Sequence, residues 1–240
     1  MRRCRKLFLV TILGAVVAAT GTALAEAGRD NTYELLRQRQ LQIEQQRIEQ
    51  EIVTPRAIEV SGERAFLGNK GAPIAIYVFS DFQCAYCSKG AETVAAVRKK
   101  YGSKVKVTFL HFPMPMHAQA RPAAQYFEAI ALQSAKKAYE FHDKLFAAQD
   151  KLTSDREAFL DATAKEVGAD LAKLKKDMAG EKVLGRIAVD EKMAQSFGFT
   201  GTPGFVVAGV VLKGAYPAET FEQIIDYRLK PPARKISSKK

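Results

Sequence analysis

Apolar residues along the middle of the chain follow first a strand pattern, then a helix pattern, then a strand pattern again. Residues 74–79 (IAIYVF) are a continuous apolar, β-rich run, which predicts a central strand covered on both faces. Apolar residues then recur at helical spacing until three cations at 98–100, namely Ala91, Val94, Ala95 and Val97. Residues 105–112 form a second strand-like run. The order predicts a βαβ unit.

The pattern of residues 118–197 is almost entirely helical, with Gly168 and Gly180 as interruptions. Ser154-x-x-Glu157 matches a capping box. The last helix of the stretch shows apolar positions at helical spacing and ends before Gly198: Val183, Ile187, Ala194 and Phe197. Residues 205–207 and 210–212 then predict a hairpin, and 218–229 a closing helix.

A long polar helix is predicted ahead of this body. Residues 30–54 contain no Pro or Gly and are rich in helix-forming Gln, Glu, Arg and Leu, and Pro55 ends the pattern. An apolar stripe includes Leu36, Leu41 and Ile43. We favour a self-association helix; a solvated stalk or a helix folded back on the body are the alternatives. Residues 58–60 suggest a short strand after it.

Residues 1–25 have the pattern of a signal peptide. A basic segment up to Lys6 precedes an apolar stretch of 13 residues, 7–19, and Ala23-Leu24-Ala25 matches the small-x-small cleavage signal. The apolar run is short for a membrane span, although an uncleaved anchor is the alternative. The sequence therefore predicts cleavage after Ala25 and a periplasmic location, where disulfides persist.

Charge adds little to this picture once its distribution is considered. The chain has 240 residues, is 47% apolar and has a formal charge of +11. The leader carries four of its basic groups and no acid, the tail 230–240 carries five, and the remaining body has a charge of only +2. The basic tail contains no interleaved aromatic residue, so we expect no nucleic-acid partner. The composition also excludes a disordered chain.

Two of the three cysteines remain after cleavage, and they are spaced C-x-x-C. Cys84 and Cys87 would close too small a loop to staple the fold, and no second C-x-x-C offers a zinc ligand set. Redox chemistry is therefore the leading interpretation. A helix N-terminus lowers the pKa of a thiol, so Cys84 is expected as the exposed nucleophile. Cys87, one turn further along, would resolve a mixed disulfide.

Three segments carry a resemblance to a known family: FSDFQCAYC (79–87), HFPMPMHAQARPAAQYFEA (111–129) and FGFTGTPGFVV (197–207). They resemble the exported DsbA-like thiol–disulfide oxidoreductases of the thioredoxin superfamily, including the ScsC and DsbG types. The resemblance covers residues 55–229 and implies an α/β thioredoxin fold. An all-helical subdomain at about 117–197 would be inserted in that fold, and an N-terminal helix would precede it. It also implies that Thr202 and Pro203 form a cis-proline loop that binds the substrate backbone.

Ala85, Tyr86 and Asp81 are the expected tuning residues. Strong oxidants of this family commonly have His where this chain has Tyr86, so a less acidic Cys84 and a milder oxidant are expected. Asp81 would relay a proton to Cys87, or else act as a helix cap or surface carboxylate. Met114, Met116 and His117 suggest a copper(I) site less strongly than they suggest packing.

The sequence thus predicts an exported oxidase or isomerase that exchanges disulfides with unfolded or misfolded proteins. It would need no metal and no cofactor beyond its own Cys84–Cys87 disulfide, and a membrane partner would reset that pair. A homo-oligomer through residues 30–54 is a further expectation. The alternative is a periplasmic copper- or zinc-binding protein, or a holdase, that uses the same thiols.

Overall fold

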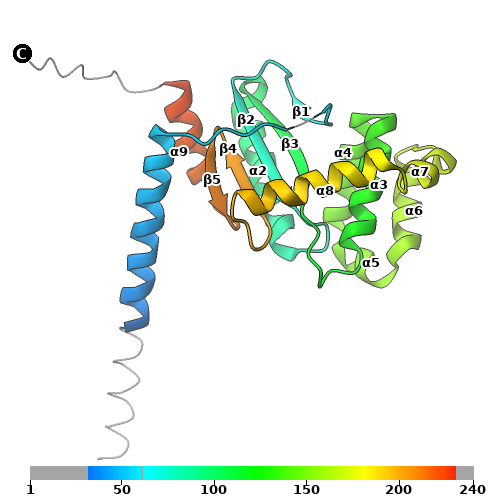
Figure 1. Ribbon diagram of the computed structural model, residues 1–240, viewed down its shortest axis with the longest axis horizontal. Coiled ribbons are helices and arrows are strands. Elements are labelled where there is room, and N and C mark those ends of the chain that lie inside the picture. The colour runs from blue at the N-terminus through cyan, green and yellow to red at the C-terminus, as the bar shows by residue number, and fades with distance from the viewer. Residues whose placement is uncertain (1–31, 61, 231–240) are drawn as a thin grey trace, which may run out of the picture. The chain divides into compact units, whose positions relative to one another are not determined.

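The computed structural model describes residues 32–60 and 62–230 (Figure 1). The predicted signal peptide and the tail beyond Lys230 lie outside these residues. Chain contacts define two units, one ending at Gln50 and the other beginning at Glu51. The first contains most of a helix over residues 32–53, which matches the predicted helix and ends before Pro55. Large apolar side chains on this helix are more than half exposed: Tyr33, Leu35, Leu36, Leu41 and Ile43.

The second unit is built on a five-stranded sheet in the order β1-β3-β2-β4-β5. The strands are β1 (Leu67–Gly68), β2 (Ile74–Ser80), β3 (Val105–His111), β4 (Gly204–Val207) and β5 (Val210–Lys213). Strands β2 and β3 are parallel, as the predicted βαβ unit requires, and the other pairs are antiparallel. The predicted hairpin is confirmed. The short strand expected at 58–60 is wrong: these residues form no strand, and the edge strand beside β3 is β1 instead.

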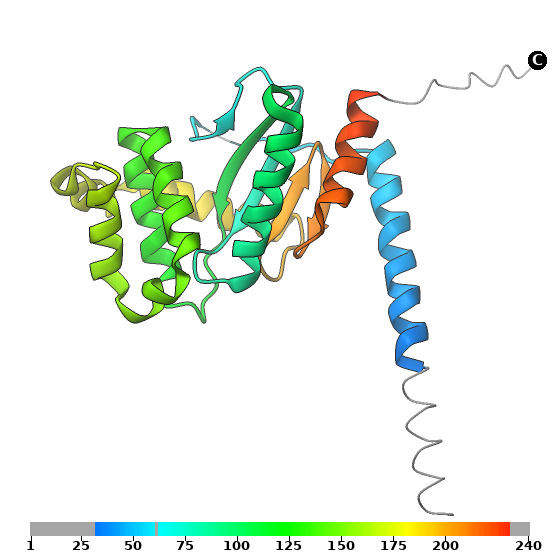
Figure 2. The ribbon, with the colours of Figure 1, turned by 180° about the vertical axis from the view of Figure 1, so that it is seen from behind.

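Helices cover both faces of the sheet (Figures 1 and 2). They are α2 (Ala85–Tyr101), α3 (Ala120–Gln133), α4 (Ala135–Ala147), α5 (Gln149–Ser154), α6 (Arg156–Glu166), α7 (Leu171–Asp177), α8 (Glu181–Ser196) and α9 (Ala218–Leu229). Helices α2 and α9 lie on one face. The end of α8 lies on the other, where Phe79, Leu110 and Phe199 form part of a buried cluster. Helices α3–α8 confirm the all-helical insertion.

Two helix ends show where local patterns succeed and fail. Gly198 follows α8 with a φ of +74°, a left-handed conformation that suits glycine at a helix end, as predicted. The predicted capping box is wrong: Ser154 is the last residue of α5, and Asp155 precedes α6 without a side-chain cap. The Ser154 hydroxyl instead donates to the Asp155 carboxylate, 2.7 Å away.

Candidate active site

The two cysteines lie where the central strand turns into helix α2. Cys84 is the N-cap residue of α2, with φ −75° and ψ 118°, and its carbonyl accepts from the Cys87 N–H at 2.9 Å. Cys87 lies one turn into the helix and is 1% exposed. Cys84, expected to be exposed, is only 8% exposed. The sulfurs are not joined by a disulfide in this structure.

The environment separates the two thiols in acidity. A hydrogen bond from the Cys87 thiol lowers the pKa of Cys84 from 9.0 to about 5, and the Thr202 side chain and the backbone N–H groups of Cys87 and Tyr86 add to this shift. Burial opposes this shift. Burial and the neighbouring Cys84 raise the pKa of Cys87 far above its ordinary range. One sulfur is therefore an anion at neutral pH, while the other is held as a thiol.

A cis-proline loop faces this pair. The Thr202–Pro203 peptide bond is cis, and the Cys84 sulfur is 3.4 Å from the Thr202 carbonyl oxygen. Helix α2 approaches the loop at Gly90, where an added Cβ would lie 2.9 Å from the Phe205 ring and 3.3 Å from Pro203. Glycine is required here because any side chain would push the helix away. The cis bond that the resemblance implied is present.

Asp81 is buried and makes contacts different from those expected. Its carboxylate accepts from the Gln83 N–H at 2.7 Å, from the Met114 N–H at 2.8 Å and from His117 Nδ1 at 2.7 Å. Its backbone N–H, and not its carboxylate, points at the Cys87 sulfur, 3.4 Å away. Asp81 therefore joins the active-site loop to the segment before α3, and it is neither a surface carboxylate nor a side-chain cap of α2.

The helical insertion holds the active-site loop through a second residue, which the sequence analysis missed. The side chain of Gln149, the first residue of α5, donates to the carbonyl of Phe82 at 2.8 Å and to that of Cys84 at 3.0 Å. No local pattern marks Gln149, because its role depends on where the insertion folds back. Ser80 and His142 were missed as well: both line a cavity that also reaches Cys87.

The residues between the cysteines face outward. Ala85 and Tyr86 are both exposed, Tyr86 by 63%, and the Lys89 ammonium lies 5.6 Å from the Tyr86 ring centre. They are therefore accessible at the surface beside Cys84. The copper(I) interpretation gains little, because Asp81 already engages His117 and because Met116 is 72% exposed.

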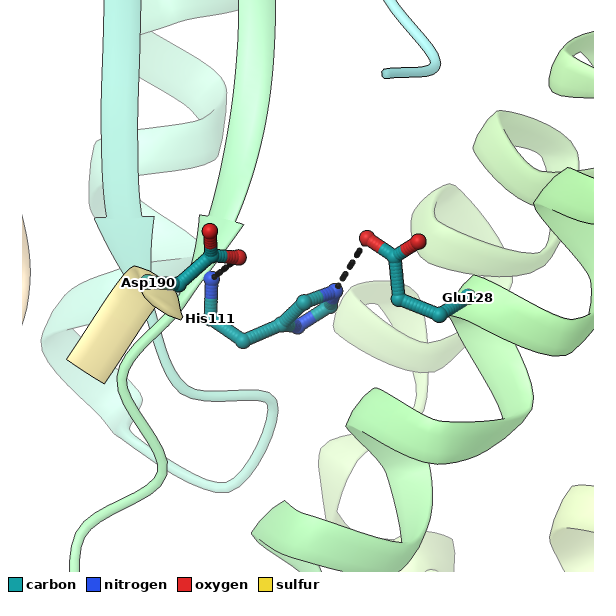
Figure 3. Close-up of side chains that lie close together, drawn as sticks. All are labelled: His111, Glu128 and Asp190. Atoms are coloured by element: carbon teal, nitrogen blue, oxygen red, sulfur yellow. Dashed lines mark hydrogen bonds and ion pairs between the residues drawn. The ribbon is translucent and has the colours of Figure 1, made fainter. Parts of the chain in front are cut away.

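One buried cluster in the described residues has the composition of a metal site. Ligand atoms of His111, Glu128 and Asp190 lie within 4.8 Å of one another (Figure 3). However, Arg64 pairs with Asp190 at 2.6 Å and with Glu128 at 3.2 Å, and Arg186 pairs with Glu128 at 2.8 Å. Two guanidinium charges already balance the two carboxylates, so these residues do not fit a metal ion. The cluster is an ion-pair network that ties the insertion to the sheet.

A thiol pair at the start of a helix, opposite a cis-proline, is the dithiol site of a thioredoxin fold. The chain belongs to the thioredoxin family, whose family model matches residues 60–227. This confirms the thioredoxin family and fold that the resemblance implied.

Solved structures support the same assignment. A thioredoxin-like oxidoreductase from Silicibacter pomeroyi is 26% identical with a TM-score of 0.61, covering 70% of this chain and 92% of that one. The thiol-disulfide exchange protein alpha-DsbA2 from Wolbachia pipientis shares the fold at 17% identity, with a TM-score of 0.62 and coverage of 68% and 86%.

Curated relatives match over a smaller share of their length. The chain is 33% identical over 159 residues to a Na(+)/H(+) antiporter, NhaA 3, from Salinispora tropica, covering 66% of this chain and 24% of the relative. The chain thus spans about a quarter of that protein's length. Among the described residues, none of the helices is both long and apolar enough to cross a membrane.

Proposed function

We propose that this protein exchanges disulfides with polypeptide substrates through Cys84, with Cys87 as the resolving thiol. The observation that carries the proposal is the separation of the two sulfurs in acidity within one helical turn, opposite Thr202 and Pro203. Only a thiolate attacks a disulfide, and only a nearby second thiol can release the resulting mixed disulfide.

The electrons balance without a dissociable cofactor. The Cys84 thiolate attacks one sulfur of a substrate disulfide, and the other substrate sulfur leaves as a thiolate. Cys87 then attacks the Cys84 sulfur, the Cys84–substrate bond breaks, and the pair is left as a disulfide while the substrate is reduced. The reverse sequence oxidises a substrate dithiol, and a membrane redox partner is the proposed means of resetting the pair.

The proposed substrates are unfolded or misfolded exported proteins. The exposed Tyr86 offers an apolar contact beside the nucleophile, and the Thr202 carbonyl and cis-Pro203 offer a backbone docking edge. The absence of a cation at position 86 favours a mild oxidant with isomerase activity over a strong oxidase. We also propose export to the periplasm with cleavage after Ala25, on the pattern of residues 1–25.

The test measures the equilibrium of the cysteine pair with glutathione, together with turnover on reduced and on scrambled ribonuclease. An isomerase restores activity to the scrambled substrate faster than it oxidises the reduced one. Titration of the reduced protein with copper(I) and zinc tests the alternative function. Tight metal binding without turnover of either substrate would replace the proposed function by metal binding.

We further propose that the N-terminal helix joins copies of this chain. Leu36 and Ile43 are seven residues apart on one helix and are 57% and 58% exposed, which is unusual for large apolar side chains without a partner. Light scattering of the full chain should give a multiple of its 26.5 kDa or of the slightly smaller mass after cleavage. Leu36→Glu with Ile43→Glu should reduce it to a monomer.

The control for that experiment is Gln38→Glu with Gln42→Glu, which adds the same charge at exposed positions of the same helix. An unchanged mass for the Leu36/Ile43 variant, or a monomeric parent, would remove the argument for assembly.

A further inference from the structure

A cavity of about 80 Å³ lies behind the active-site helix, between α2, α4 and the sheet. Helix α4 lies beside α2 on this face (Figure 2). Most of the lining is apolar, and the polar lining residues are Ser80, Cys87, Arg98, Tyr139, His142 and Asp143. Cys87 is 1% exposed, whereas the Asp143 side chain is 75% exposed. The cavity therefore connects the buried sulfur with groups at the surface.

His142 is held in one orientation at this cavity. Its ring centre lies 4.8 Å from those of both Phe109 and Phe146, each in an edge-on arrangement. Its Nδ1 is 2.8 Å from a carboxylate oxygen of Asp143. Because an ionised carboxylate only accepts, Nδ1 carries the proton of the neutral ring and Nε2 carries the free lone pair. An imidazole fixed in this way is a ready base.

Cys87 needs such a base, because it is buried as a thiol and must lose its proton to attack. The Asp81 N–H donates to the Cys87 sulfur and cannot accept. The Asp81 carboxylate already takes hydrogen bonds from three groups, and the Ser80 hydroxyl, which lines the cavity together with Cys87, is too weak a base to keep the proton. The cavity is large enough for a few water molecules, so Ser80 and water would bridge the sulfur to His142.

We propose that His142 is the proton acceptor for Cys87, reached through Ser80 and cavity water, with Asp143 as its positioning residue. As the Cys87 sulfur attacks Cys84 in the mixed disulfide, its proton passes to His142, the Cys84–Cys87 bond forms, and the substrate leaves as a thiolate. In the opposite direction, His142 returns the proton to the departing Cys87. This inference rests on the proposed function, since it concerns the second half of the exchange.

The experiment measures the two steps of the exchange, attack by Cys84 and release by Cys87, separately. In a Cys87→Ala background, the reaction of Cys84 with 5,5′-dithiobis(2-nitrobenzoate) reports the first step. With Cys87 present, release of 5-thio-2-nitrobenzoate from the mixed disulfide on Cys84 reports the second. We expect His142→Asn to slow the second step by about 100-fold, the usual contribution of a general base, and to leave the first unchanged. Asp143→Asn should have a smaller effect in the same direction.

The pH profile distinguishes a base from a packing residue. The second step of the parent should slow in acid, where an imidazole is protonated, and His142→Asn should lose that part of the profile. Besides Cys87 and His142, the titratable or charged groups lining the cavity are Arg98, Tyr139 and Asp143. Equal slowing of both steps at every pH would overturn the proposal, as would a variant that keeps the parent's rate and profile.

A second variant tests the cavity with His142 intact. Ala91 lines the cavity, so Ala91→Leu should fill it, displace water and slow only the second step. Ala96→Leu makes the same change on an exposed position of α2 outside the cavity and should have no effect. A normal second step in Ala91→Leu would overturn the water path even where His142→Asn fails to fold. If Cys84 itself does not react with the reagent, the proposed function fails instead.

Discussion

Two buried polar clusters lie on neighbouring strand ends and are organised in opposite ways. Ser80 at the end of β2 is paired in register with His111 at the end of β3. Beside Ser80, two thiols are driven apart in acidity. Beside His111, Glu128 and Asp190 are matched by the two guanidinium groups of Arg64 and Arg186. In the first cluster the two thiols differ in acidity, which suits one of them to act as a nucleophile. In the second cluster the positive and negative charges are equal in number, and their ion pairs hold two parts of the fold together.

Removing the nucleophile should have the largest effect on activity. Cys84→Ser should reduce disulfide exchange to the rate of the substrate alone, because a hydroxyl at this position is not ionised at neutral pH. Cys87→Ser should keep the first attack and accumulate mixed disulfides, which non-reducing electrophoresis would show. Both variants should remain folded. Retained turnover in Cys84→Ser would contradict the reactive role assigned to the thiol cluster.

The ion-pair network should instead control stability. Glu128→Gln leaves the Arg186 and Arg64 charges without one of their two carboxylates, which costs about 3–5 kcal/mol for a buried pair. The free energy of unfolding in urea measures this cost, and the glutathione equilibrium of the folded protein should not change. Glu140→Gln is the control, because its pair with Lys136 is exposed and contributes under about 1 kcal/mol. Equal losses in both variants would contradict the assignment.

The two clusters should act in separate pH ranges. The folded pKa of Cys84 is lowered from 9.0 to about 5, so the stability of the reduced protein should rise with pH between these values. Burial opposes ionisation of Glu128, but His111, Arg64 and Arg186 hold its pKa at about 2, down from 4.5. Its contribution is complete above 4.5 and is lost as pH falls through about 2. Unfolding curves against pH should lose the upper slope in Cys84→Ser and the lower one in Glu128→Gln.

The smallest expected effect concerns the Thr202 hydroxyl. Its oxygen is buried and has no hydrogen-bond partner among the described residues, and the hydroxyl helps to lower the pKa of Cys84. Thr202→Val should raise that pKa slightly, since one of several polar groups near the thiolate is lost. Titration of the thiolate absorbance measures the change. Thr200→Val, at an exposed position, is the control, and equal pKa values in the two variants would exclude a role for Thr202.

Local sequence patterns predicted the elements of this fold because their residues carry the information themselves. The apolar run 74–79 specifies a strand. The C-x-x-C marks the start of a helix, and Gly198 marks the end of α8. The capping box at Ser154 failed because the tertiary arrangement ended α5 at that serine. The two-residue strand β1 is too short for its pattern to be recognised.

The site was predictable only in part for a related reason. Cys84 and Cys87 are only three residues apart, so their spacing predicted that they would lie together at the start of a helix. Gln149 and His142 come from the insertion, about 60 residues further along the chain, and reach the cysteines only after the chain folds back. The role of Asp81 as a tuning residue stays a prediction, and the direction of its carboxylate depends on His117 and Met114, which no local pattern could place.

The edge of the sheet formed by β5 matters for the design of shortened versions of the chain. Strand β5 is the last strand, and the Glu51 carboxylate accepts from its Val211 N–H at 2.7 Å, while the Arg56 N–H donates to the Gly209 carbonyl at 2.8 Å. A chain trimmed to the family-matched region, from residue 60, would lose both contacts. The Val211 N–H and the Gly209 carbonyl would then lack these partners at the sheet edge and could pair with strands of other molecules. We therefore expect this truncation to cause aggregation, although it lies well outside the active site.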